Sequence, residues 1–164
     1  MFLEYFDQME AWADAAVKSL KASGYKQLYQ QSIDAGYMVH GEYNYHNILF
    51  DATSEKDNYG HRKLNVYTVN FDHFKKNVQV EDLYYFLRKA MEKQGFKEWI
   101  SDGILNAYSA IIPLGKNELE YLKNRLMYPE KFFKVANSYY HSNKAWISIK
   151  NVEKCRCSQT NEGK

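Results

Sequence analysis

Apolar side chains recur at helical spacing over most of the chain, and this pattern predicts a mainly helical protein. The first helix is expected over residues 2–22. Its apolar face carries Phe2, Phe6, Met9, Ala13, Ala16 and Leu20. Ser23-Gly24 is expected to end this helix, because glycine readily adopts the left-handed conformation that follows many helices. A shorter helix is expected over residues 26–35, before Gly36.

The second half of the chain shows the same period. A helix is expected from Val80 to Gly95, with apolar positions at Leu83, Phe86, Leu87, Ala90 and Met91. Further helices are expected over residues 98–111, around residues 119–126, over residues 130–141 and over residues 148–155. The remaining tail, residues 158–164, is polar and is expected to fray.

One polar segment, His40 to Asn47, interrupts this helical pattern and lies between two short apolar runs. The runs, residues 38–39 and 48–50, are typical of short buried strands, and Gly41 indicates a tight turn between them. Residues 51–63 have no apolar period and are expected to form an exposed loop. Residues 64–71 have strong strand propensity and are expected to pair with residues 48–50 as an antiparallel hairpin.

These elements predict an α+β protein that is mainly helical, with one compact domain over residues 1–157. A chain of 164 residues is long enough to bury a core of its own. The 15 Tyr, 9 Phe and 3 Trp favour an aromatic-rich core, and a tyrosine-rich assembly surface is the alternative.

Charge and cysteine usage exclude several function classes. A net charge of +2 is too small to indicate a nucleic acid or an anionic membrane as partner. No stretch approaches the roughly 18 consecutive apolar residues of a membrane span. Cys155 and Cys157 are separated by one residue, which is typical neither of a disulfide framework nor of a complete zinc site, and fits a reducing cytoplasm.

The polar segment also carries candidate chemistry. His40, Glu42 and Asn47 have the order expected of a phosphoryl-transfer loop. Such a loop needs a carboxylate that orients and deprotonates an attacking hydroxyl, and an amide oxygen that reaches a magnesium ion.

Here the sequence resembles known families. His40-Gly41-Glu42 with Asn47 resembles the His-Gly-Asp-x-x-x-x-Asn loop of aminoglycoside phosphotransferases and choline kinases, and Asn70-Phe71-Asp72 falls where these families carry an Asp-Phe metal-binding turn. Longer phrases look like the CotS-type spore coat proteins. They are His-Gly-Glu-Tyr-Asn-Tyr-His-Asn, Val-Asn-Phe-Asp-His-Phe, Glu-Asp-Leu-Tyr-Tyr-Phe-Leu-Arg-Lys, Tyr-Pro-Glu-Lys-Phe and Asn-Lys-Ala-Trp-Ile. The resemblance covers about residues 3–154.

The resemblance implies the C-terminal lobe of a protein-kinase-like fold, with roles for five residues. Glu42 would take the place of the catalytic base, and His40 would orient the loop. Asn47 and Asn70 would take the places of two magnesium ligands that also hold the nucleotide. Asp82 would anchor the loop. Glutamate at position 42 adds a methylene to the base position, and asparagine at position 70 lacks the charge that helps to hold magnesium, so both weaken catalysis.

Two functions follow as expectations. The first is a non-catalytic kinase-like module, made in the cytoplasm and located in the spore coat, with no cofactor. Its partners would be other coat proteins or a second copy bound through an exposed cleft floor, with neither nucleic acid nor membrane involved. The alternative is a small-molecule phosphotransferase half that uses Mg-ATP, whose N-terminal lobe is missing from a truncated chain or supplied by another chain.

Overall fold

The structure is a computed structural model that describes residues 2–56 and 58–141. The described residues form two compact units. One unit combines residues 2–25 with residues 119–141, and the other contains residues 26–56 and 58–118. The α+β class expected from the sequence is confirmed. Among the described residues, no helix is both long and apolar enough to cross a membrane.

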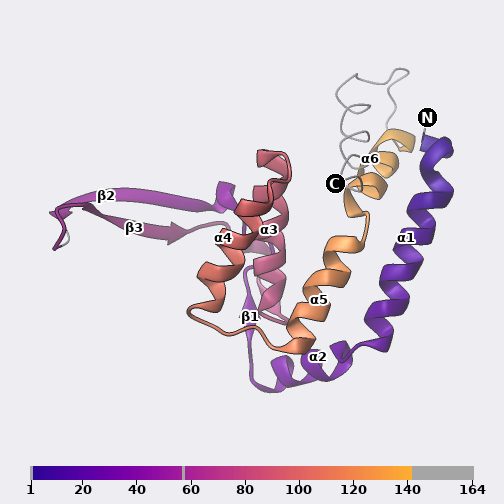
Figure 1. The fold of residues 1–164 in the computed structure, drawn as a ribbon, viewed down its shortest axis with the longest axis horizontal. Helices are drawn as coiled ribbons and strands as arrows, with labels where there is room; N and C mark the ends of the chain where they lie inside the picture. The colour runs from indigo at the N-terminus through magenta and orange to yellow at the C-terminus, as the bar shows by residue number, and fades with distance from the viewer. Residues whose placement is uncertain (1, 57, 142–164) are drawn as a thin grey trace. The chain divides into compact units, whose positions relative to one another are not determined.

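The first unit is helical (Figure 1). It contains α1 (Phe2–Ala22), most of α5 (Lys116–Met127) and α6 (Glu130–Tyr140). The bounds of α1 match the predicted helix. Met9 of α1 is buried with Phe132 and Ala136 of α6, so the apolar faces of these two helices share one core. Tyr25 stacks on Tyr121, with ring centroids 5.4 Å apart.

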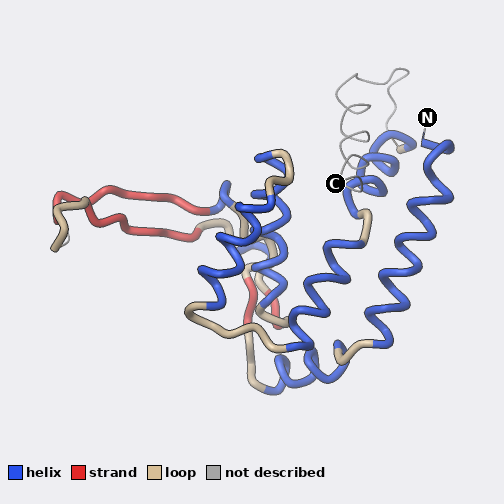
Figure 2. Tube along the Cα trace, viewed as in Figure 1, coloured by secondary structure: helices blue, strands red, loops and turns tan. Residues whose placement is uncertain are grey.

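The second unit holds every strand found among the described residues, shown in red in Figure 2. Its helices are α2 (Tyr25–Asp34), α3 (Val80–Gln94) and α4 (Glu98–Ser109). The short strands β1 (Met38–Val39) and β4 (Lys75–Lys76) pair antiparallel, as do the longer strands β2 (Ile48–Lys56) and β3 (Arg62–Thr68). Its buried apolar residues are Val39, Val78, Val80, Leu83, Tyr84, Leu87 and Ile100.

The predicted hairpin is confirmed, but the expected loop over residues 51–63 is wrong. Strand β2 continues to Lys56 and β3 begins at Arg62, so much of this segment is paired strand. The described side chains of this segment, those of residues 51, 55–56 and 58–63, are exposed to water. A strand that is exposed in this way needs no apolar period.

The predicted burial of the two short apolar runs, residues 38–39 and 48–50, is also partly wrong. Val39 is buried, whereas Met38, Leu49 and Phe50 are exposed. Glycine 95 ends α3 in the left-handed conformation (φ 70°), as predicted. The helix predicted over residues 148–155 and the tail over residues 158–164 lie outside the described residues.

Candidate functional site

The segment from His40 to Asn47 is tied to α3 by Asp82. The backbone N–H of His40 donates to Oδ2 of Asp82 at 2.7 Å, and the N–H of Gly41 donates to Oδ1 at 3.0 Å. Both donors belong to buried residues, so one carboxylate satisfies two N–H groups that water does not reach. The predicted anchoring role of Asp82 is therefore confirmed.

Burial and hydrogen bonding act on the Asp82 carboxyl in opposite directions. Desolvation raises its pKa, because burial disfavours the charged form, while the N–H groups of His40 and Gly41 lower it. The net effect is a pKa above the ordinary value of 3.8. Folding therefore favours the protonated form of this carboxyl more than the unfolded chain does.

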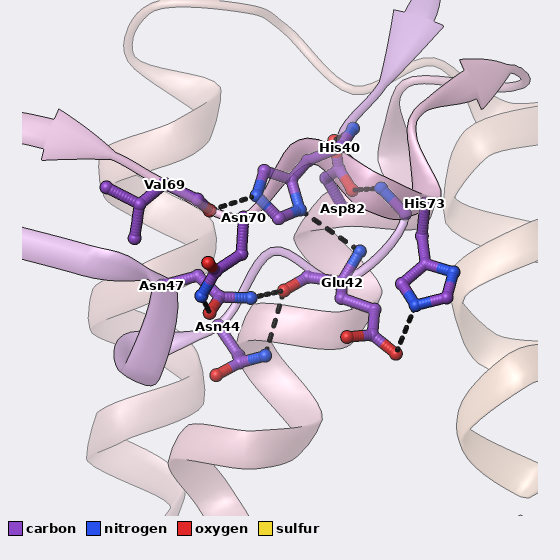
Figure 3. Close-up of polar contacts among 9 residues, drawn as sticks. His40, Glu42, Asn44, Asn47, Val69, Asn70, His73 and Asp82 are labelled. Atoms are coloured by element: carbon purple, nitrogen blue, oxygen red, sulfur yellow. Dashed lines mark hydrogen bonds and ion pairs between the residues drawn. The ribbon is translucent and has the colours of Figure 1, made fainter.

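His40 is buried and both of its ring nitrogens are engaged (Figure 3). Nδ1 accepts a hydrogen bond from the backbone N–H of Glu42 at 3.2 Å. Nε2 lies 2.8 Å from the carbonyl oxygen of Val69 and therefore carries the proton in the neutral ring, donating across to the segment after β3. The ring also packs on Phe71, with centroids 4.7 Å apart. Such contacts agree with the orienting role that the resemblance implies for His40.

Gly41 lies where two segments approach closely. Its φ of +84° is a left-handed conformation that glycine adopts without strain. A Cβ atom at this position would collide with the backbone carbonyl oxygen of His73. The turn therefore requires glycine for two independent reasons.

Three asparagines hold the second half of the loop. The side-chain amides of Asn44 and Asn47 both donate to the carbonyl oxygen of Glu42, at 2.8 and 3.0 Å. The amide of Asn70 in turn donates to Oδ1 of Asn47 at 2.9 Å. Asn70 has a φ of 64°, a left-handed conformation that asparagine tolerates better than most residues. Hydrogen bonds thus bring together the two residues predicted as metal ligands.

The carboxylate of Glu42 lies apart from these two amides. Its side chain is exposed, and Oε1 is 3.8 Å from Nε2 of His73, itself an exposed side chain (Figure 3). An exposed ion pair of this length contributes little to stability. The structure thus brings His40, Asn47 and Asn70 into one network with the backbone of Glu42, and leaves the Glu42 carboxylate at the surface.

This donor set does not fit a magnesium ion that holds a triphosphate. Magnesium sites in proteins rely on carboxylates, whereas Asn47 and Asn70 are uncharged and bond to each other. Within residues 2–56 and 58–141 there is also no group of three or more His, Cys, Asp or Glu side chains placed to hold a metal ion.

The variant Asn70→Asp tests the bond between the two amides. A carboxylate cannot donate to Oδ1 of Asn47, so two acceptor oxygens would face each other. We expect a loss of about 1–2 kcal/mol in the free energy of unfolding, measured by urea denaturation without divalent metal. The matched control is Asn106→Asp on the exposed surface of α4, expected to change stability by less than about 0.5 kcal/mol. Equal effects of the two variants would show that the Asn47–Asn70 bond contributes nothing.

Comparisons of the chain with protein-family models, with curated proteins and with solved structures give no match.

The structural role of Asn44 was not predicted from the sequence. Its Nδ2 donates to the carbonyl of Glu42, and its Oδ1 accepts from the backbone N–H of His46 at 2.9 Å. The Oδ1 contact caps the 3₁₀ helix η1 (Tyr45–Asn47). An asparagine side chain often accepts a hydrogen bond from the backbone N–H two residues after it. Asn44 in a polar segment was therefore a sequence signal for this cap.

Proposed function

We propose that the chain is a non-catalytic kinase-like module that acts in assembly of the spore coat. The observation that carries the non-catalytic part is the hydrogen bond between Asn70 and Asn47. The two positions that resemble metal-ligand positions of phosphotransferases hold neutral amides, and the amide of Asn70 donates to the side-chain oxygen of Asn47. A loop that closes on itself in this way keeps its fold without a nucleotide.

The arrangement of elements supports the kinase-like part of the proposal. The order is a helix, a His-containing loop, an antiparallel hairpin, a turn with Asn70, and then a helix whose first turn carries Asp82. Asp82 bonds the loop backbone, and His40 bonds the turn after β3, so the loop, the turn and α3 form one connected network. The coat assignment rests on the sequence phrases that resemble CotS-type proteins.

The place of Glu42 gives independent support. A general base must lie within hydrogen-bond reach of the hydroxyl that it deprotonates, beside the groups that bind the phosphate. In this chain the Glu42 carboxylate lies near His73, while its own backbone carbonyl accepts from Asn44 and Asn47. Glu42 therefore contributes to the loop mainly through its backbone.

Calorimetric titration of the full chain with Mg-ATP tests the proposal. We expect no binding heat at nucleotide concentrations up to about 1 mM, because neutral amides hold magnesium weakly. The matched variant is Asn70→Asp, which supplies the carboxylate that the resemblance places there. Micromolar affinity in the unaltered chain would overturn the proposal and favour the phosphotransferase half.

A further inference from the structure

The exposed side of α1, the indigo helix of Figure 1, carries a regular stripe of side chains. Their spacing of three and four residues places them on one face of a helix. They are Glu4, Asp7, Ala11, Asp14, Lys18 and Lys21. All of them are exposed, whereas Met9, Ala13 and Ala16, on the other side of α1, are buried. We call this exposed set the α1 stripe.

The charges of the α1 stripe are separated along the helix, with carboxylates at Glu4 and Asp7 and ammonium groups at Lys18 and Lys21. The helix dipole favours an acid in the first turn and a base in the last turn, and its effect falls off beyond those turns. It therefore accounts for Glu4 and Lys21 but not for Asp7 and Lys18. Within the part of the chain that the structure describes, none of these four side chains forms an ion pair. The α1 stripe therefore presents a negative end and a positive end to solvent.

The α1 stripe is complementary to itself when a second helix runs in the opposite direction. Glu4 and Asp7 are three residues apart, and so are Lys18 and Lys21. An antiparallel helix that sets its Lys21 level with Glu4 therefore also sets its Lys18 level with Asp7. One alignment thus joins both negative positions to both positive positions.

We propose that a second copy of this chain binds to the α1 stripe, with the two α1 helices antiparallel about a two-fold axis. Two-fold symmetry forms each of the pairs Glu4–Lys21 and Asp7–Lys18 twice. A parallel arrangement would instead set each charge level with the same charge, and repulsion disfavours it. A purely basic or purely acidic partner would match only one end of the stripe. Every copy of this chain, by contrast, carries the matching charges at the matching spacing.

Small and apolar side chains lie where the two helices would be closest. The alignment sets Ala11 level with Asp14 of the second copy, near the two-fold axis. An alanine there permits the interaxial distance of about 8–10 Å that packed helices have. The alignment also sets Leu3, whose side chain is 78% exposed, level with the exposed Ala22 of the second copy. Contact between these two side chains would remove apolar surface from water.

The association is expected to be weak and dependent on salt. An exposed ion pair contributes little by itself, and complementary charges determine which surfaces meet more than how tightly they bind. Screening shortens the reach of these charges from about 10 Å at 0.1 M salt to about 3 Å at 1 M. We therefore expect a dissociation constant on the order of 100 µM at about 0.05 M salt, and roughly fivefold weaker binding or more at about 0.5 M. A dimer of this kind would serve the assembly role proposed above, and its tests are independent of nucleotide binding.

Charge reversal, followed by sedimentation equilibrium of the full chain, tests the pairing. Asp7→Lys and Lys18→Glu each set like charges level with each other at two symmetric places, so each variant alone should dimerise at least about tenfold more weakly than the unaltered chain. An equimolar mixture of the two variants should form a heterodimer, because every pair in it joins opposite charges. The double variant Asp7→Lys, Lys18→Glu should regain self-association for the same reason.

The matched controls are Asp72→Lys and Lys75→Glu, which make the same charge changes at exposed positions outside α1. They should leave dimerisation within about twofold of that of the unaltered chain. Far-ultraviolet circular dichroism checks that each variant keeps its helices. A monomer at about 1 mM for the unaltered chain in low salt would overturn the proposal. So would a mixture of Asp7→Lys and Lys18→Glu that stays monomeric, or equal effects of the variants and the controls.

Cross-linking tests the antiparallel direction. In a Cys155→Ser, Cys157→Ser background, Glu4→Cys and Lys21→Cys chains are mixed at about 200 µM and treated with a short bis-maleimide that spans about 10 Å. Level positions on packed helices lie within this reach, whereas the two copies of residue 4 would lie about 25 Å apart along the helix axis. We expect the mixture to give roughly fivefold more covalent dimer, or more, than Glu4→Cys alone. Equal or greater yields from Glu4→Cys alone would overturn the antiparallel pairing.

Discussion

Replacing Asp82 with alanine is expected to lower the free energy of unfolding by about 3 kcal/mol. The carboxylate accepts hydrogen bonds from the N–H groups of His40 and Gly41, both of which belong to buried residues. Alanine would leave two buried donors without an acceptor, and unsatisfied buried donors are more costly than the loss of an exposed hydrogen bond. Urea denaturation followed by circular dichroism measures the loss. Faster amide hydrogen exchange at His40 and Gly41 would locate it.

Two further variants separate this role from general effects of charge. Asp72→Ala removes an exposed carboxylate and is expected to change stability by less than about 0.5 kcal/mol. Asp82→Asn keeps the side-chain size but stays neutral at every pH. Burial raises the pKa of Asp82 in the folded protein. The stability gained from protonation of this carboxyl is therefore fully present below the unfolded pKa and is lost as the pH rises through the folded pKa. The stability of the unaltered chain relative to Asp82→Asn should therefore rise as the pH falls through this window. A difference independent of pH would contradict that assignment.

Helices were well predicted from sequence because their signal is local. The bounds of α1 follow from the apolar period of residues 2–22 and from Ser23-Gly24 after it, without knowledge of the helices that pack on α1. In the same way, Gly95 determines where α3 ends. The length of the β2–β3 ribbon was harder to predict from the sequence. Beyond Phe50, β2 has polar residues at positions that a buried strand would fill with apolar ones. Pairing with β3, rather than burial, therefore extends β2 to Lys56.

The candidate site was predicted as a set of residues but not as a network. Spacing alone selects His40, Glu42 and Asn47 as neighbours in one loop. It does not reveal that Asn70 bonds Asn47 from 23 positions away, or that the Glu42 carboxylate lies beside His73. These contacts depend on how the turn after β3 packs against the loop. The apolar period of the sequence carries no information about such tertiary packing.

Replacing Gly41 with alanine is expected to destabilise the protein by about 3 kcal/mol or more. Part of this arises from the positive φ of +84°, which by itself costs an alanine roughly 1–2 kcal/mol. The larger part comes from the collision of the new Cβ with the backbone carbonyl of His73. A backbone atom cannot rotate away as a flexible side chain can, so the loop and the turn after β3 must separate.

Gly36→Ala is the matched control, because Gly36 also has a positive φ (+73°) and has no atom within 4 Å of where a Cβ would lie. The difference between the two variants in urea denaturation therefore isolates the close approach at Gly41 from backbone strain. Separation of loop and turn would also lengthen the contact from Nε2 of His40 to the carbonyl of Val69. The ring proton resonances of His40 should therefore change in Gly41→Ala but not in Gly36→Ala when followed by nuclear magnetic resonance at fixed pH. Equal losses of stability would mean that the loop yields at Gly41 without strain. Unequal losses would show that one carbonyl, contributed by a segment more than thirty residues away, makes glycine obligatory in this loop.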